Sequence, residues 1–168
     1  MSLTSEELFQ QLKRLEIECT THSHPAVFTV DQASQHCNHL PGFHCKNLFF
    51  KDKKGHLWLI VTCNKQEINI KALQKAIGSA RLSFGKPDLL KQTLGVTPGS
   101  VSPFALINDT ACLVRVVLDA KMMEADIINF HPLRNNATTA ITPEGLRKFI
   151  KACGHFVQEL EFSALERV

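Results

Sequence analysis

The sequence contains no apolar run that approaches the roughly 18 residues of a membrane-spanning helix, which argues against a membrane protein. It also lacks an export signal, because the N-terminal segment MSLTSEELFQQL is acidic and amphipathic. None of its six cysteines forms a C-x-x-C pair. Without an export signal, these scattered cysteines predict reduced thiols and a cytoplasmic protein.

Several signatures of enzyme chemistry are missing too. There is no G-x-S-x-G elbow and no recognisable Cys–His signature, so the sequence gives little support for covalent catalysis. It has no P-loop or dinucleotide fingerprint, so we expect no cofactor. One group of histidines and cysteines has the composition of a metal site but lacks the two spaced ligand pairs that zinc requires, so we predict no metal. This group contains His22, His24, His36, Cys37, His39, His44 and Cys45.

Charge of either sign is modest. Charged residues make up 21% of the chain, and the formal net charge is +3. This balance permits contact with nucleic acid but falls short of the basic footprint of a dedicated binder. The hydrophobic content of 44% is that of a soluble globular protein. No repeat, low-complexity tract or linker divides the chain, so we expect one domain over residues 1–168.

Hydrophobic periodicity predicts helices and strands that interleave along the chain. A T-x-x-E capping box at Thr4 predicts a first helix of about four turns, and Asn69, Pro87 and Thr142 are predicted to start later helices. Apolar segments on both sides of KDKKGH predict a hairpin, and its second strand is apolar enough to be covered on both faces. The remaining expectations are a short helix over 29–37 and strands over 19–24, 82–84, 104–107, 113–118, 127–130, 138–141 and 157–162. Together these elements predict an α/β fold with a mixed, mostly antiparallel sheet surrounded by helices.

The stretch GVTPGSVSPFAL, residues 95–106, is rich in glycine, proline and serine and leads into an apolar segment. Pro98 and Pro103 fix the backbone and have no N–H of their own. We predict that the amides of residues 99–102 are free to point at an oxyanion, a carboxylate or a phosphate. The alternative is an ordinary turn between a helix and a strand.

Two other stretches carry polar side chains beside predicted strands. Lys46 and Asn47 enter the first hairpin strand, where alternation would put Lys46 on the face of Leu48 and Phe50. A charge on an apolar face is either useful there or reaches water from the strand end. The second stretch starts at His131, which Pro132 holds in an extended conformation. Its small polar side chains suit recognition of a polar group, or else satisfy the backbone of a strand–loop–strand connection.

Taken together, CKNLFF, GVTPGSVSPFAL and NFHPLRNNATTAIT resemble the YbaK/prolyl-tRNA synthetase-associated domain superfamily, which clears misacylated tRNA. The similarity covers nearly the whole chain and is closest to the freestanding, PrdX-like branch. It implies a compact α/β domain that hydrolyses the ester between a wrong amino acid and tRNA, with alanine on proline tRNA as the substrate. Two alternatives remain: a deacylase for cysteine, serine or another small residue, and a non-catalytic module that binds tRNA or a synthetase.

The resemblance also assigns roles to residues. It implies catalytic roles for Lys46, Gly99 and Ser100. The implied substrate-binding residues are Asn47, Val101, Ser102, Phe104, His131, Asn135, Thr138 and Thr139. Lysines near the hairpin tip and on a nearby helix are candidates for contact with the tRNA acceptor stem, although they also fit a solvated surface: Lys51, Lys53, Lys54, Lys71 and Lys75. The expected partners are the acceptor end of proline tRNA and, as a further candidate, prolyl-tRNA synthetase, with neither DNA nor a membrane.

Overall fold

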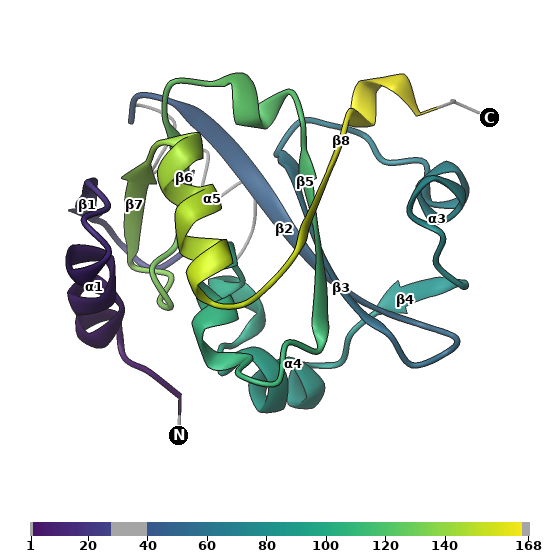
Figure 1. The fold of residues 1–168 in the computed structure, drawn as a ribbon, viewed down its shortest axis with the longest axis horizontal. Helices are drawn as coiled ribbons and strands as arrows, with labels where there is room; N and C mark the ends of the chain where they lie inside the picture. Colours follow the sequence, from purple (N-terminus) through teal and green to yellow (C-terminus); the bar gives the residue numbers. More distant parts are fainter. Residues whose placement is uncertain (1, 28–39, 166–168) are drawn as a thin grey trace.

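A computed structural model describes residues 2–27 and 40–165 (Figure 1). It contains an eight-stranded sheet in the order β1-β7-β6-β2-β3-β5-β8, with β4 paired to β2. The strands are β1 Cys19–Ser23, β2 Phe43–Asp52, β3 Leu57–Cys63, β4 Leu82–Phe84, β5 Val114–Asp119, β6 Ile128–Phe130, β7 Ala137–Ile141 and β8 Val157–Leu160. The α-helices are α1 Ser5–Arg14, α3 Ile70–Ile77, α4 Pro87–Leu94 and α5 Pro143–Ala152, and the 3-10 helices are η1 Pro98–Ser100, η2 Pro103–Asn108, η3 Met122–Glu124 and η4 Phe162–Ala164.

The predicted fold class is confirmed. Of the described strand pairs, β1/β7, β6/β7, β2/β3 and β2/β4 are antiparallel, while β2/β6, β3/β5 and β5/β8 are parallel. The sheet is therefore mixed, with helices packed around it. The helix predicted over 29–37 lies outside the described residues. None of the helices within the described ranges is long and apolar enough to cross a membrane.

The helices start where the sequence predicts them. The Thr4 hydroxyl accepts a hydrogen bond from the N–H of Glu7 at 3.2 Å, and the Asn69 side chain accepts one from the N–H of Ala72 at 3.1 Å. Helix α1 is shorter than the predicted four turns, because its 10 residues make only about three turns. The chain leaves the helix just before Glu16, whose φ of 58° lies in the left-handed region.

The strand predicted over 104–107 is wrong, because these residues belong to the 3-10 helix η2. The Ser102 hydroxyl accepts a hydrogen bond from the N–H of Phe104 at 3.2 Å, as a helix cap does. Phe104 is fully buried and packs edge-on against Phe149, with ring centroids 5.5 Å apart. A short apolar run indicates burial, but it does not distinguish a buried strand from a short helix.

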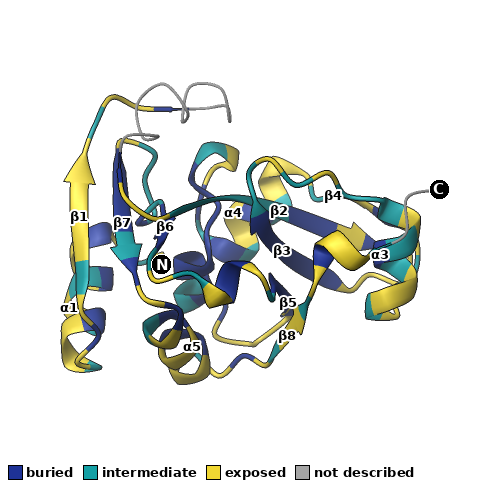
Figure 2. Ribbon diagram, turned by 90° about the horizontal axis from the view of Figure 1, so that it is seen from above, coloured by how far each residue is buried: buried dark blue, intermediate teal, exposed yellow. Residues whose placement is uncertain are grey.

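Strand β3 separates two apolar layers, and Figure 2 shows it buried along most of its length. Leu59 faces the larger layer, which contains Phe104 from η2 and Phe149 from α5. Ile60 faces the smaller layer, which contains Leu73 from α3. The prediction that this strand is covered on both faces is confirmed.

Strand β2 has one edge that is only partly paired. One edge pairs with β3 over residues 45–51. The other pairs with β6 at residues 43–44 and with β4 at residues 50–52. Within the described ranges, no strand pairs with residues 45–48 on this second edge. We call residues 45–48 the unpaired stretch of β2, and it contains the lysine and asparagine singled out in the sequence.

Candidate active site

Lys46 lies in the unpaired stretch of β2, opposite Thr62 of β3. Leu48 and Phe50 pack in the smaller apolar layer, whereas Phe49 packs in the larger one. Side chains therefore alternate along β2 as predicted, and this periodicity puts Lys46 on the face of Leu48 and Phe50. The Lys46 side chain is half-buried and has no hydrogen bond or ion pair with the described residues. Its ammonium group is available to a ligand.

Asn47 occupies the other face of β2, opposite Val61, whose side chain belongs to the larger layer. The side-chain oxygen of Asn47 is buried and has no hydrogen-bond partner among the residues that the structure describes. Leaving such an acceptor unpaired costs about 1–3 kcal/mol, which a donor from a bound ligand would recover. Asn47 is thus suited to accept a hydrogen bond from a substrate.

Of the four amides in the loop over residues 99–102, that of Ser100 is used inside a tight turn. The N–H of Ser100 donates to the carbonyl of Thr97 at 2.9 Å inside η1. The prediction that the amide of Ser100 is free is therefore wrong, because a 3-10 turn uses its own N–H groups. The amides of Gly99, Val101 and Ser102 keep their place as candidate oxyanion donors. The side chains of Ser100 and Ser102 are both buried.

Ser102 ties this loop to His131. Its hydroxyl donates to the carbonyl of His131 at 2.7 Å and accepts from the N–H of Phe104. The side chain is 0% exposed, so neither bond exchanges with solvent. This one residue fixes the loop against the end of β6, and the structure brings together two stretches that lie 29 residues apart in the sequence.

His131 is held in a defined orientation. Its Nδ1 lies 2.8 Å from the carbonyl of Ala137, and because a carbonyl can only accept, Nδ1 carries the proton. Burial lowers the pKa of His131 below its ordinary value, and the charge of His24 lowers it further, while the bond to Ala137 partly opposes both. The neutral imidazole therefore presents the lone pair of Nε2.

The polar residues after His131 hold the neighbouring segments. The side-chain amide of Asn135 donates to the carbonyl of Val27 at 2.9 Å. The hydroxyl groups of Thr139 and Thr21 are 2.8 Å apart across β7 and β1. Thr138 lies 2.8 Å from Nε2 of His24. These bonds position the chain around His131, and direct contact of these residues with a substrate stays a prediction.

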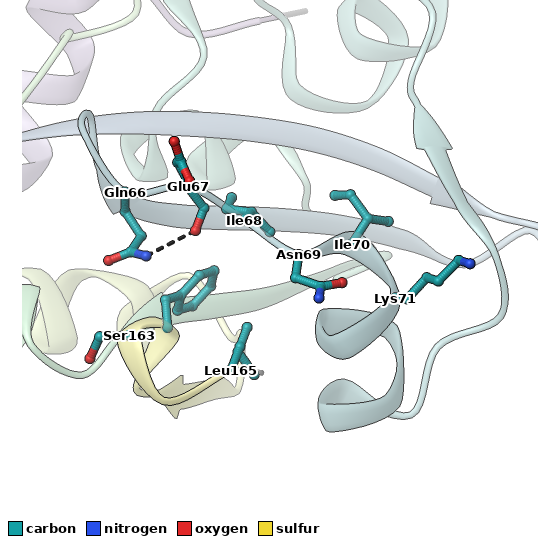
Figure 3. Close-up of a pocket in the computed structure, with 9 residues that line it drawn as sticks. Gln66, Glu67, Ile68, Asn69, Ile70, Lys71, Ser163 and Leu165 are labelled. Carbon is teal, nitrogen blue, oxygen red and sulfur yellow. Dashed lines mark hydrogen bonds between the residues drawn. The ribbon is translucent and has the colours of Figure 1, made fainter. Parts of the chain in front are cut away.

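The predicted tRNA-contact lysines lie on the hairpin, at the end of β2 away from Lys46, and on α3. Lys51, Lys53 and Lys54 are exposed at the hairpin, and Lys71 and Lys75 are exposed on α3. A hollow of about 490 Å³ lies between the segment before α3 and η4, and Figure 3 shows the residues that line it. Of the predicted site residues only Lys71 lines it.

No three His, Cys, Asp or Glu side chains are grouped to hold a metal ion within residues 2–27 and 40–165. Cys45 is a core thiol whose Sγ lies 3.3 Å from the sulfur of Met122. Burial raises its pKa well above the ordinary value, with smaller contributions from Cys63 and Asp119. A protonated thiol is a poor ligand and a poor nucleophile. His36, Cys37 and His39 lie outside the described residues.

Comparison with known proteins decides the family. Residues 24–149 match the aminoacyl-tRNA editing domain family. The chain belongs to this family. It is 38% identical over 159 residues to the zebrafish (Danio rerio) prolyl-tRNA synthetase associated domain-containing protein 1, covering 94% of this chain and 86% of that protein. It is 34% identical over 157 residues to the prolyl-tRNA editing protein ProX of Acetoanaerobium sticklandii, covering 93% and 96%.

A solved structure agrees with this editing-domain fold. A protein named as a proposed trans-editing enzyme for prolyl tRNA synthetase superposes with a TM-score of 0.69 at 20% identity, covering 95% of this chain and 99% of that one. At this level of identity the likeness concerns the fold alone. The predicted family and fold are confirmed by these comparisons.

One neighbour of His131 is not among the site residues predicted from the sequence. His24 stands with its ring centroid 5.9 Å from that of His131. The two histidines lie more than 100 residues apart, and only the pairing of β1 with β7 brings them together. A weak signal existed, because both precede a proline and are therefore held extended.

Replacement of Ser102 by alanine is expected to lower the free energy of unfolding by about 1–3 kcal/mol. The change leaves the carbonyl of His131 and the N–H of Phe104 without their buried partner. Denaturant unfolding measures the effect. Ser163→Ala is the matched control, since that hydroxyl is exposed and among the described residues bonds Glu161 alone, and it should change stability by less than about 0.5 kcal/mol. Equal stability of the two variants would contradict the role of Ser102.

Proposed function

We propose that this editing domain is a deacylase acting in trans that hydrolyses the ester of alanyl-tRNA(Pro). The observation that carries the proposal is the arrangement around the unpaired stretch of β2. An uncommitted lysine lies on one face of this stretch, and on the other face lies a buried asparagine oxygen that has no partner among the described residues. The name of the Acetoanaerobium relative, a prolyl-tRNA editing protein, supports proline tRNA as the acceptor.

The chemistry requires positioning more than a strong nucleophile. An aminoacyl ester is already activated, so most of the barrier can be lowered by orienting water and stabilising the developing oxyanion. The oxygen of water attacks the carbonyl carbon, the bond to the ribose oxygen breaks, and a proton passes from water to that oxygen. The products are a free amino acid and a deacylated tRNA.

Each site residue has a role in this scheme. Lys46 holds the terminal phosphate or the ester through its ammonium group. Asn47 accepts a hydrogen bond from the substrate's charged amino group. His131 orients the attacking water through the lone pair of Nε2, because its Nδ1 is committed to Ala137. The amides of Gly99, Val101 and Ser102 are the proposed donors to the oxyanion.

Discrimination between alanine and proline follows from size. A small pocket admits the methyl group of alanine, whereas the larger proline ring is excluded by steric clash. The same pocket discriminates less strongly against cysteine and serine, because each of their side chains is larger than that of alanine by one non-hydrogen atom. The two competing functions are therefore a deacylase for one of these residues and a module that binds tRNA without cleaving it.

Single-turnover hydrolysis of alanyl-, prolyl-, cysteinyl- and seryl-tRNA(Pro) tests the proposal. We expect the alanyl ester to be cleaved fastest and the prolyl ester to decay at the rate of buffer alone. Faster cleavage of the cysteinyl or seryl ester would replace the alanyl assignment. If no ester decays faster than in buffer while tRNA still binds, the binding module is the correct function.

A further inference from the structure

Phe84 is an exposed aromatic side chain that the site around Lys46 does not use. It is 69% exposed, whereas large apolar side chains are mostly buried in a folded chain. It ends the short strand β4, which pairs with the hairpin end of β2 (Figure 1). An exposed ring at a fixed position is a candidate contact for a ligand.

The ring of Phe84 is held in place. It stacks on the ring of Phe50, with centroids 4.7 Å apart and an interplanar angle of 26°. The next residue, Gly85, donates its N–H to the carbonyl of Phe49 at 2.9 Å. A side chain at Gly85 would collide with the Phe49 ring, so the strand end lies tightly against β2. One face of the Phe84 ring is thus covered by Phe50, and the side chain remains largely open to solvent.

The stacked rings of Phe84 and Phe50, which we call the platform, lie on the same face of β2 as the proposed catalytic lysine. Phe50 is four residues beyond Lys46, and alternate residues of a strand share a face. Four residues of strand span about 13 Å. A polymer whose end is bound at Lys46 can therefore reach Phe84 with units close to that end.

The surroundings of Phe84 are basic. In the segments 46–56 and 79–91, seven of the nine Asp, Glu, Lys and Arg residues are basic. Of the two acids, Asp52 is buried and hydrogen-bonded to Trp58, which leaves Asp88 as the exposed one. Lys51, Lys53 and Arg81 are all exposed beside β4. This charge favours a polyanion over an apolar protein segment.

We propose that Phe84 stacks against an unpaired base of the tRNA 3′ end while the neighbouring basic side chains contact the backbone phosphates. Aromatic side chains in a basic groove bind single-stranded nucleic acid in this way, because every base has a π face. The proposal rests on the proposed function, since it takes the tRNA end bound at Lys46 as its ligand. It adds a base-stacking contact to the lysine contacts expected from the sequence.

The test compares how tightly the full chain binds two RNA hairpins, neither of which carries an amino acid. One carries the acceptor stem of proline tRNA with its unpaired 3′ CCA tail, and the other is the same stem without the tail. Phe84→Ala should weaken binding of the tailed hairpin roughly fivefold or more. Binding of the blunt hairpin should not change. Phe84→Trp should keep tail-dependent binding.

Two further variants separate stacking from folding and from general apolarity. Phe84→Leu keeps an apolar side chain over Phe50 but removes the ring, so it should lose tail-dependent binding as the alanine variant does. Phe156→Ala removes another exposed aromatic, 95% exposed and next to β8, and should leave both hairpins unaffected. Thermal unfolding of every variant excludes a folding defect.

The outcomes distinguish this inference from the proposed function. If the wild type hydrolyses alanyl-tRNA(Pro) but Phe84→Ala binds both hairpins normally, the stacking site is refuted and the function stands. If no ester is cleaved yet binding depends on both the tail and Phe84, the function fails and the stacking site stands. If Phe84→Ala instead converts a dimer into a monomer with RNA binding intact, the platform is a self-association surface and the inference is overturned.

Discussion

Replacing Lys46 by alanine is expected to reduce the single-turnover rate of alanyl-tRNA(Pro) hydrolysis by about 100-fold to 1000-fold. The proposed ammonium contact to the ester or the phosphate has no substitute, because no other lysine lies in the unpaired stretch of β2. The fold should survive the change. Lys46 is half-buried and forms no hydrogen bond or ion pair with the described residues, so no buried partner is left unsatisfied.

Two measurements on three proteins make this prediction specific. Hydrolysis is followed for the wild type, for Lys46→Ala and for Lys151→Ala, which removes an exposed lysine from the last turn of α5 and should keep the wild-type rate. The affinity for tRNA without an amino acid is measured for each protein. The affinity of Lys46→Ala should lie within a few-fold of the wild-type value, because many basic side chains share the contact with tRNA. A Lys46→Ala enzyme that cleaves at the wild-type rate would remove Lys46 from the mechanism.

The local chemistry of the sequence predicts most elements of the fold. Capping residues such as Thr4 and Asn69 specify helix starts through hydrogen bonds within one turn, so no distant contact is needed to recognise them. The hairpin around Gly55 is equally local, because the turn and its two strands are contiguous. The strand predicted over 104–107 is wrong because an apolar run indicates burial and not the type of element. The sequence prediction does not include the cap by Ser102, which starts the 3-10 helix.

The candidate site is harder to predict because its geometry depends on pairings between distant strands. The sequence singles out Lys46, Asn47 and His131, but the neutral state of His131 depends on burial and on His24, which only the β1/β7 pairing brings near. The missing partner of the Asn47 oxygen depends on which segments surround β2. Likewise, a pattern of glycine and proline does not show that the Ser100 amide is used inside its own turn.

The pH dependence of hydrolysis is expected to reveal His131. Its neutral form presents the Nε2 lone pair, and burial lowers its pKa below the ordinary value of 6.5. The enzymatic rate should therefore hold as pH falls past 6.5 and decline only when pH falls through the lower pKa of the folded state. The stability of the fold depends on His131 in the same direction. Its contribution to the free energy of unfolding is complete above the unfolded pKa of about 6.5 and is lost as pH falls from there through the folded pKa.

His131→Gln should lower the rate by about 100-fold or more and remove the acidic decline, because no group remains in that position that gains a proton in this range. The profile is measured as single-turnover rates with the buffer rate subtracted at each pH, since the ester also decays without enzyme. His56→Gln serves as the control, because it removes a histidine that is exposed at the hairpin and should leave the decline in place. A decline centred at or above pH 6.5, or one that persists in His131→Gln, would assign the titrating group to another residue.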